Sequence, residues 1–161
     1  DMRALPLRDG SLHIVTNFFT AFGYFLEDRE NLAVFDEIAR VLRPGGWFLF
    51  DFLNAEYAGR QIAAQPSRQR QQDAEGATWD IHRKISSDGR RAEKHMVKLG
   101  EGEVEREIRE SVRLFPPEAL RPALVDTGLI PVQEWGNYTG EVFNRETSPR
   151  FIILCRKQKN M

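Results

Sequence analysis

Two apolar stretches joined by a helical segment dominate the first third of the chain. Residues 12–19 (LHIVTNFF) are mostly apolar and β-prone without clean alternation, which is typical of a strand covered on both faces. After Asp28, a candidate N-cap, apolar residues recur at helical spacing up to the turn at residues 43–46 (RPGG). Residues 47–52 (WFLFDF) follow as a second buried strand. This order predicts a β-α-β unit with a right-handed crossover.

A different pattern occupies the middle of the chain. Residues 59–76 are rich in Gln, Arg and Ala and predict a polar helix or a linker. Three β-prone segments follow at residues 78–85, 92–99 and 104–114, separated by Asp88-Gly89 and by Gly100-Glu101-Gly102. The apolar residues of the third segment all fall on even positions, and charged residues occupy the opposite face. We therefore expect a three-stranded antiparallel meander that is solvated on one face.

The C-terminal part is expected to add one helix and two strands. The helix begins at Pro116-Pro117 and ends at Gly128, with Pro122 inside it, where a proline should kink or shorten it. Residues 130–135 and 151–156 are the two strand candidates. The loop between them is long, and loops of such length usually indicate function or disorder.

Charge and cysteine content exclude several classes of protein. The formal net charge of −1 offers no bulk attraction to nucleic acid or to an anionic membrane, and no apolar run is long enough for a membrane span. The one cysteine, Cys155, excludes an intramolecular disulfide framework and a four-cysteine zinc site. We therefore expect no nucleic-acid, membrane or metal partner, and a cytoplasmic location.

Four stretches, taken in order, resemble one family. Residues 1–6 (DMRALP) followed by 9–15 (DGSLHIV) look like an acidic residue, a loop and the fourth strand of its sheet. Residues 19–25 (FTAFGYF), 42–46 (LRPGG) and 148–154 (SPRFIIL) look like the segment after that strand, the turn before the fifth strand and the start of the last strand. On these motifs the chain resembles the class I S-adenosylmethionine-dependent methyltransferases of the small-molecule type. The meander is similar to the insertion over the active site of sugar-amine N-methyltransferases.

The resemblance implies an α/β fold, a partial Rossmann-like methyltransferase sheet with the three-stranded antiparallel meander inserted. It divides the chain into residues 1–58, the C-terminal half of the donor-binding sheet; residues 59–114, a linker helix and antiparallel lid; and residues 115–161, a helix and the final antiparallel strand pair. The family's glycine-rich donor loop does not occur here, and the chain opens at Asp1 without an initiator methionine. We therefore expect an N-terminally truncated portion that binds the donor weakly or not at all, with a homodimer as a further expectation from exposed strand edges.

S-adenosylmethionine is the cofactor that the resemblance implies. A carboxylate followed by a backbone N–H can satisfy both the exocyclic amine and the ring nitrogen of adenine, so Asp1 and the Met2 amide are candidate adenine contacts. Folds with parallel sheets bind ligands beyond the carboxyl ends of their strands. Asn17, Phe18 and Phe19 are therefore expected beside the methionine arm of the donor.

Four residues are candidate contacts for a small-molecule acceptor: Tyr24, His82, Tyr138 and Arg150. Tyr24 follows a glycine where the family places active-site residues, whereas His82 and His95 lie in charge-rich strands that favour surface positions. Arg150 is a candidate anchor for an anionic acceptor, although an ion pair within the protein is favoured. No catalytic residue is assigned, because methyl transfer releases a neutral thioether and depends mainly on alignment in a dry cavity.

Two alternatives to a methyltransferase remain open at this point. A fragment of a Rossmann oxidoreductase would share the β-α-β pattern, although a nucleotide-binding glycine loop is equally absent. A non-catalytic α/β interaction module would use the charged residues 80–113 as a partner surface. The acceptor, and whether its nitrogen or oxygen is methylated, also stay open.

Overall fold

The computed structural model describes residues 1–100 and 104–159, in which eight strands form two four-stranded sheets and three helices accompany them. The elements are β1 (Leu12–Asn17), α1 (Asp28–Val41), β2 (Leu42–Leu53), α2 (Ala55–Ala64), β3 (Arg68–Gln72), β4 (Thr78–Ile85), β5 (Arg91–Leu99), β6 (Val104–Arg113), α3 (Pro117–Asp126), β7 (Leu129–Trp135) and β8 (Arg150–Lys157). None of the described helices is long and apolar enough to span a membrane.

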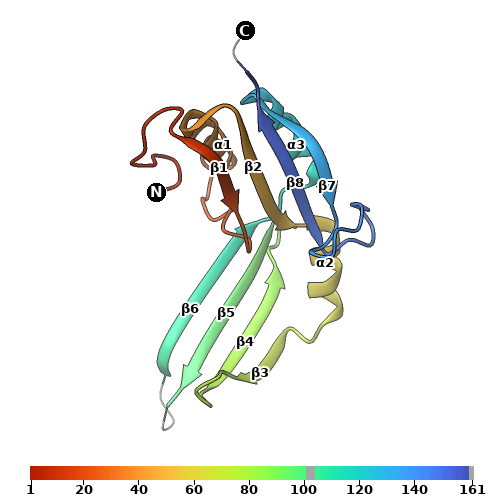
Figure 1. The fold of residues 1–161 in the computed structure, drawn as a ribbon. Coiled ribbons are helices and arrows are strands. Elements are labelled where there is room, and N and C mark those ends of the chain that lie inside the picture. The colour runs from red at the N-terminus through yellow and green to blue at the C-terminus, as the bar shows by residue number, and fades with distance from the viewer. Residues whose placement is uncertain (101–103, 160–161) are drawn as a thin grey trace.

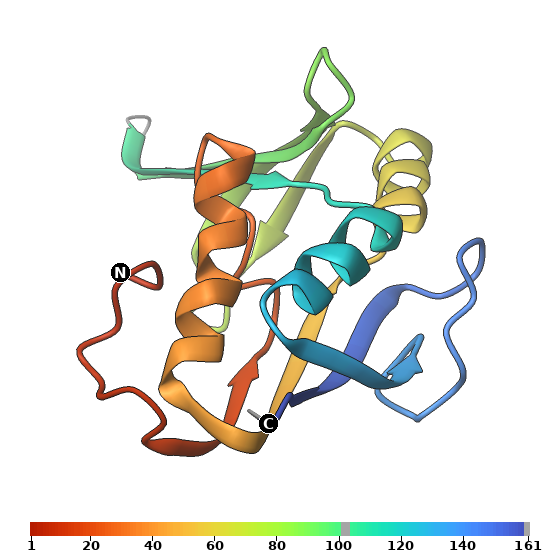
Figure 2. The ribbon, with the colours of Figure 1, turned by 90° about the horizontal axis from the view of Figure 1, so that it is seen from above.

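The main sheet has the strand order β1-β2-β8-β7, with β1 parallel to β2 and with β8 antiparallel to both of its neighbours. Helices α1 and α3 lie side by side over one face of this sheet (Figure 2). The predicted β-α-β unit and the final antiparallel strand pair are therefore confirmed, and the chain has the α/β fold that the resemblance implied. Pro122 lies inside α3, as expected.

Phenylalanine side chains fill the core between the main sheet and its two helices. Alternate residues of β2 point to the same face, so Phe48, Phe50 and Phe52 all pack beneath α1 and α3. Phe22, from the segment between β1 and α1, stacks on Phe35 with the ring centroids 4.9 Å apart. The segment that follows β1 is thereby anchored in the core.

Three sequence expectations about the β-α-β unit need correction. The first strand is not covered on both faces: Ile14 is 63% exposed, because β1 is an edge strand of the described sheet and the helices cover only one face. The N-cap of α1 is Glu27 rather than Asp28. The Asp28 carboxylate instead binds Arg113 of β6 and Arg90, which directly precedes β5. The glycine turn at residues 43–46 lies within the assigned span of β2, which begins as soon as α1 ends.

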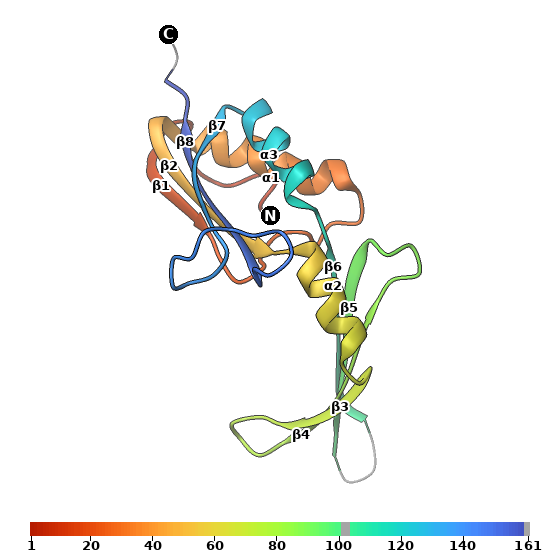
Figure 3. The same cartoon turned by 90° about the vertical axis from the view of Figure 1, so that its right-hand side faces the viewer.

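The second sheet, which we call the lid sheet, contains β3 to β6 in sequential antiparallel order and projects away from the main sheet (Figures 1 and 3). The three predicted strands are present as β4, β5 and β6, but the prediction of three strands is wrong because β3 adds a fourth. The polar segment before it is partly helical, as α2. The apolar face of β6 was expected to be covered, but Val104, at the outer end of the lid sheet, is exposed. Of the predicted turn at 100–102, residues 101 and 102 lie outside the described residues.

Strand β3 escaped prediction because its sequence, RQRQQ, has no apolar alternation. Its register is set by backbone pairing with β4 and by a bidentate ion pair between Arg68 and Asp80, with N–O distances of 2.7 to 3.1 Å. A strand of this kind is specified by pairing with its neighbour rather than by an apolar pattern of its own.

Gly23 joins the segment after β1 to the lid sheet. Its φ is +94°, and a Cβ there would lie 2.9 Å from the carbonyl oxygen of Arg113 and 3.1 Å from Val112. We expect Gly23→Ala to lower the free energy of unfolding by about 2 kcal/mol more than Gly89→Ala, because it adds overpacking to the positive-φ strain. Gly89 is the matched control, with φ +72° and no neighbour within 4 Å of the added Cβ. Equal losses in chemical denaturation would show that the close contact carries no cost.

Candidate functional site

The carboxyl ends of β1 and β2 and the start of β8 meet where the lid sheet joins the main sheet (Figure 1). Ligands of α/β folds bind at this edge of the sheet. The segment after β1 and the loop between β7 and β8 both contact it, through Phe19 and Tyr138.

A buried carboxylate organises this edge. Asp51 on β2 is fully buried, and its Oδ1 accepts a hydrogen bond from Arg150 Nε at 2.7 Å. Its Oδ2 accepts from the Phe19 backbone N–H at 2.9 Å and from the Tyr138 hydroxyl at 2.8 Å. Burial and the hydrogen bond to Asp51 raise the pKa of Tyr138, so its phenol stays protonated at neutral pH. Phe19, Tyr138 and Arg150, three candidates from the sequence, thus converge on a residue that the sequence analysis missed.

The backbone that follows β1 adopts a left-handed turn. Phe19 and Thr20 have φ values of +56° and +63°, which non-glycine residues rarely adopt. This turn leaves the Phe19 side chain in solvent, so that Phe19 as a residue is 80% exposed, with its ring centroid 5.9 Å from Phe18 and 6.4 Å from Tyr138. Strained backbone of this kind occurs preferentially at functional sites.

Two of the candidate donor residues, Met2 and Asn17, contact each other where β1 ends, just before this turn. The Nδ2 of Asn17 is 3.9 Å from the sulfur of Met2, so the opening loop contacts the end of β1. Asn17 is buried, and its Oδ1 has no hydrogen-bond partner among the described residues. The half-exposed Asp1 carboxylate accepts hydrogen bonds from the backbone N–H of Arg3 at 2.9 Å and from its guanidinium at 2.6 Å.

A cleft of about 350 Å³ lies between the main sheet and the lid sheet. Its lining includes Phe19, Thr20 and Tyr24 after β1, Leu53 and Ile62 at β2 and α2, and Arg83, Lys94, Glu110 and Val112 of the lid sheet. Lys94 and Glu110 form an ion pair at 3.6 Å. Burial, and secondarily the charge of Glu110, raise the pKa of Tyr24, which therefore remains a neutral phenol at neutral pH.

The structure does not bring His82 to this cleft. His82 and His95 are cross-strand partners, and so are their neighbours Arg83 and Lys94, which line the cleft. Because successive strand residues point to opposite faces, both histidines lie on the other face of the lid sheet. His95 there contacts Glu107 at 2.7 Å. His82, a candidate acceptor contact from the sequence, therefore does not line this cleft.

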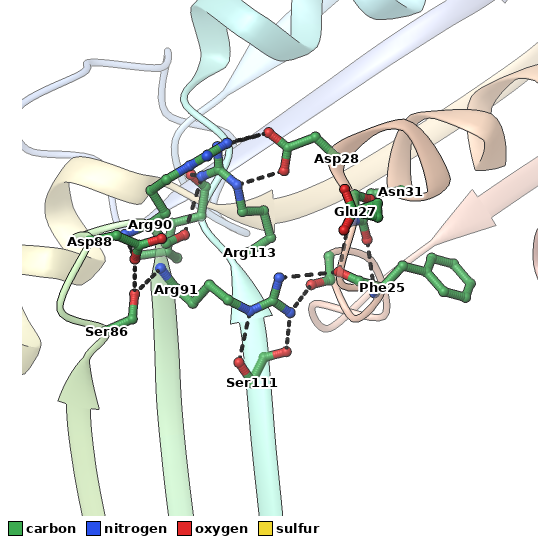
Figure 4. Close-up of polar contacts among 12 residues, drawn as sticks. Phe25, Glu27, Asp28, Asn31, Ser86, Asp88, Arg90, Arg91, Ser111 and Arg113 are labelled. Carbon is green, nitrogen blue, oxygen red and sulfur yellow. Dashed lines mark hydrogen bonds and ion pairs between the residues drawn. The ribbon is translucent and has the colours of Figure 1, made fainter.

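Two arginines fasten the lid sheet to the segment after β1 (Figure 4). Arg113 of β6 binds both carboxylate oxygens of Asp28, at 2.8 and 3.1 Å, and its backbone N–H donates to the carbonyl of Gly23. Arg91 of β5 donates to the carbonyls of Gly23 and Phe25 at 3.2 and 3.1 Å. The segment that carries Phe19 and Tyr24 is thus held by both sheets. No sequence pattern singled out these two arginines.

Metal ligands do not gather at this edge or elsewhere in the part of the chain that the structure describes, where no group of three or more His, Cys, Asp or Glu side chains could hold an ion. The polar groups at the site are instead suited to hydrogen bonding and to orienting a ligand. The Asp51 and Arg150 charges are paired with each other, as the sequence analysis favoured for Arg150.

Comparison with known proteins identifies the fold. Residues 1–50 match the sequence model of a family described as a methyltransferase domain. The CcbJ methyltransferase from Streptomyces caelestis is 20% identical, with a TM-score of 0.79 over 98% of this chain and 62% of that one. An S-adenosylmethionine-dependent methyltransferase from Clostridium acetobutylicum is 15% identical, with a TM-score of 0.79 over 99% and 63%. No curated protein sequence matches the chain significantly.

A third solved structure, the S-adenosylmethionine-bound amino pentose methyltransferase CalS10 from Micromonospora echinaspora, is 20% identical, with a TM-score of 0.63 over 98% of this chain and 63% of that one. The chain therefore has the fold of the class I S-adenosylmethionine-dependent methyltransferases, and its first fifty residues match the sequence of the methyltransferase domain. It spans less than two thirds of the length of these three structures.

Proposed function

We propose that the protein containing this chain transfers a methyl group from S-adenosylmethionine to a nitrogen or oxygen of a small-molecule acceptor. The observation that carries the proposal is the position of the left-handed turn at Phe19 and Thr20. Asn17, which contacts Met2, lies two residues before Phe19, and Phe19 and Thr20 themselves line the cleft under the lid sheet. In methyl transfer the sulfur of the donor, the methyl carbon and the acceptor atom must lie in line. The exposed rings of Phe18 and Phe19 lie between the candidate donor residues and the cleft in sequence, where the proposal places the methyl group.

The donor side fits the chemistry of S-adenosylmethionine. The buried Asn17 Oδ1, which has no partner among the described residues, is an acceptor suited to the ammonium group of the methionine arm. The faces of Phe18 and Phe19 attract a cation such as the sulfonium. Asp1 and the Met2 amide remain the proposed adenine contacts. When bound, the donor supplies an electrophilic methyl group whose departure leaves a neutral thioether, so no residue is needed to protonate the leaving group.

The acceptor side is proposed to orient its ligand rather than to activate it strongly. The Tyr24 phenol is neutral at neutral pH, and burial and the charge of Glu110 raise its pKa further, so it can donate a hydrogen bond to an acceptor but does not act as an anionic base. Tyr138 and Arg150 contribute through Asp51, to which both are bonded, rather than as free ligands of the substrate. A cleft of about 350 Å³ is in the range of sites for small metabolites.

The expected domain division, substrate class, location and oligomeric state are also parts of the proposal. Residues 1–58 and 115–161 would form the donor-binding unit, and residues 59–114 would cover the acceptor, although the boundary at residue 58 falls inside α2. The net charge of −1 favours a small molecule over nucleic acid. We retain a cytoplasmic location and a homodimer as parts of the proposal, and sedimentation measurements at several protein concentrations would test the dimer.

The proposal is tested with the protein that contains this chain and with methyl-labelled S-adenosylmethionine against panels of amines and hydroxylated metabolites. The expected result is label transfer to at least one acceptor, reduced in Tyr24→Ala more than in Leu26→Ala, a substitution at an exposed site of the same segment. Label transfer to no acceptor, together with turnover of a nicotinamide cofactor, would replace the proposal by the oxidoreductase alternative. For the 161-residue chain alone we expect weak or no donor binding, and low-micromolar affinity would contradict that expectation.

A further inference from the structure

Asp51 is a fully buried carboxylate to which the proposed function assigns no contact with donor or acceptor. Its three hydrogen-bond donors come from separate parts of the chain: the Phe19 amide, 32 residues away, the Tyr138 hydroxyl, 87 residues away, and the Arg150 guanidinium, 99 residues away. Burying a charge is costly unless it is paired and hydrogen-bonded, and here both carboxylate oxygens are used. A carboxylate maintained in this way in an otherwise apolar strand calls for a role beyond packing.

The backbone beside Asp51 is the part of the site most in need of support. Phe19 and Thr20 adopt positive φ values without being glycines, and such residues persist only where their surroundings hold them. The Phe19 N–H is bonded to Asp51 at 2.9 Å. The guanidinium nitrogens of Arg150 lie 3.3 and 3.4 Å from the Thr20 hydroxyl. Asp51 and its ion-pair partner therefore act on both residues of the turn.

We propose that Asp51 is a positioning residue, which holds the left-handed turn at Phe19 and Thr20 and so presents the Phe19 ring at the boundary between donor and acceptor. Through Tyr138, the same carboxylate ties the loop between β7 and β8 to this turn. The functional consequence rests on the proposed methyl transfer, whereas the structural role of Asp51 does not.

The most informative substitution is Asp51→Asn, which keeps the shape but leaves one acceptor oxygen instead of two. Arg150 is the stronger, charged donor and claims that oxygen, so the amide nitrogen of the new side chain faces the Phe19 N–H and the Tyr138 hydroxyl. The turn then loses the bond that holds it. Glycine adopts positive φ without strain, so Thr20→Gly makes the turn less dependent on Asp51.

The experiment compares Asp51→Asn in two backgrounds, with Thr20 and with Thr20→Gly, in the protein that contains this chain. We expect Asp51→Asn to lower kcat/KM for methyl transfer at least tenfold with threonine at position 20, and less than threefold with glycine. The same loss in both backgrounds, or no loss in either, would overturn the proposal, because a general contribution of Asp51 to stability, unrelated to the turn, would not be relieved by one glycine.

A second readout does not depend on enzymatic activity. Amide hydrogen exchange of Phe19, followed by NMR, is expected to be faster in Asp51→Asn than in the wild type and to be unaffected by Arg121→Gln. The control removes an ion pair of Arg121 with Glu134, on α3 and β7. Unchanged protection of the Phe19 amide in Asp51→Asn would refute the structural role even if methyl transfer is established, and absent methyl transfer with faster exchange would refute only the proposed function.

If Asp51→Asn does not fold, the double variant Asp51→Leu/Arg150→Met serves instead. It removes both members of the buried ion pair, and apolar replacements of such pairs are often tolerated. It leaves no acceptor for the Phe19 N–H, so the same faster exchange and the same relief by Thr20→Gly are expected. A protected Phe19 amide in this variant would likewise overturn the proposal.

Discussion

Replacing Phe22 with alanine is expected to lower the free energy of unfolding by about 4 kcal/mol, within the range of large-to-small core substitutions. Phe22 is fully buried and stacks on Phe35, with further aromatic contacts to Phe50, Phe52 and Phe115 at centroid distances of 5.2 to 5.6 Å. The cavity would open where the segment after β1 enters the core. We therefore expect the loss of stability to be accompanied by loss of the ordered turn at the candidate site.

Chemical denaturation of the folded protein measures this effect. Leu26→Ala is the matched control, since Leu26 belongs to the same segment but is 82% exposed, and its replacement should change the free energy by no more than about 0.5 kcal/mol. A loss below about 1.5 kcal/mol for Phe22→Ala would mean that the core can collapse around the missing ring, contrary to its central position.

Replacing Arg113 with methionine is expected to detach the lid sheet from the segment after β1. The guanidinium is nearly buried, binds Asp28 through two nitrogens, donates to the carbonyls of Arg90 and Leu114, and lies 4.8 Å from the centroid of the Phe115 ring. Methionine keeps much of the volume but none of the donors. We expect a loss of about 2 kcal/mol in stability, and a higher KM for the acceptor with little change for the donor.

Arg109→Met is the control for this experiment, because Arg109 lies on the same strand, its side chain is 77% exposed, and its ion pair among the described residues is with Glu107 of the lid sheet. The ion pair between Arg113 and Asp28 also predicts that the stability of the protein depends on pH. The hydrogen bond from Arg113 holds the pKa of Asp28 below its ordinary value of 3.8, so its stabilising contribution is present above pH 3.8 and is lost as the pH falls through the lowered pKa. The stability difference between wild type and Arg113→Met should therefore shrink in acid. A constant difference down to pH 2 would assign the effect to packing alone.

The parts of the fold that the sequence predicts are those with strong local periodicity. The β-α-β unit and strands β4 to β6 follow from apolar spacing and from turn residues such as Asp88-Gly89. Strand β3 lacks such a pattern, because pairing with β4 and the ion pair between Arg68 and Asp80 specify it. The solvated outer face of β1 likewise depends on what covers the sheet, which is a property of the assembled chain rather than of the strand.

The candidate site shows the same division. The rule that ligands bind at the carboxyl ends of parallel strands is enough to select Asn17 and Phe19 as candidates. Which face of the lid sheet His82 lies on depends on how the strands are paired, and the sequence alone does not give this pairing. In the structure its neighbour Arg83 faces the cleft instead. Asp51 was missed because its partners are distant in sequence. A single carboxylate inside the apolar run WFLFDFL is nevertheless a sequence signal by which it could have been found.

The most direct test of the proposed donor site is an NMR titration of the protein that contains this chain with S-adenosylhomocysteine, the unreactive product of the donor. We expect the largest amide shift changes at Met2, Asn17 and Phe19, that is, at and next to the contact between Met2 and Asn17. Shift changes confined to the face of the lid sheet that carries His82 and His95, with none at these three residues, would contradict the placement of the donor and the function built on it.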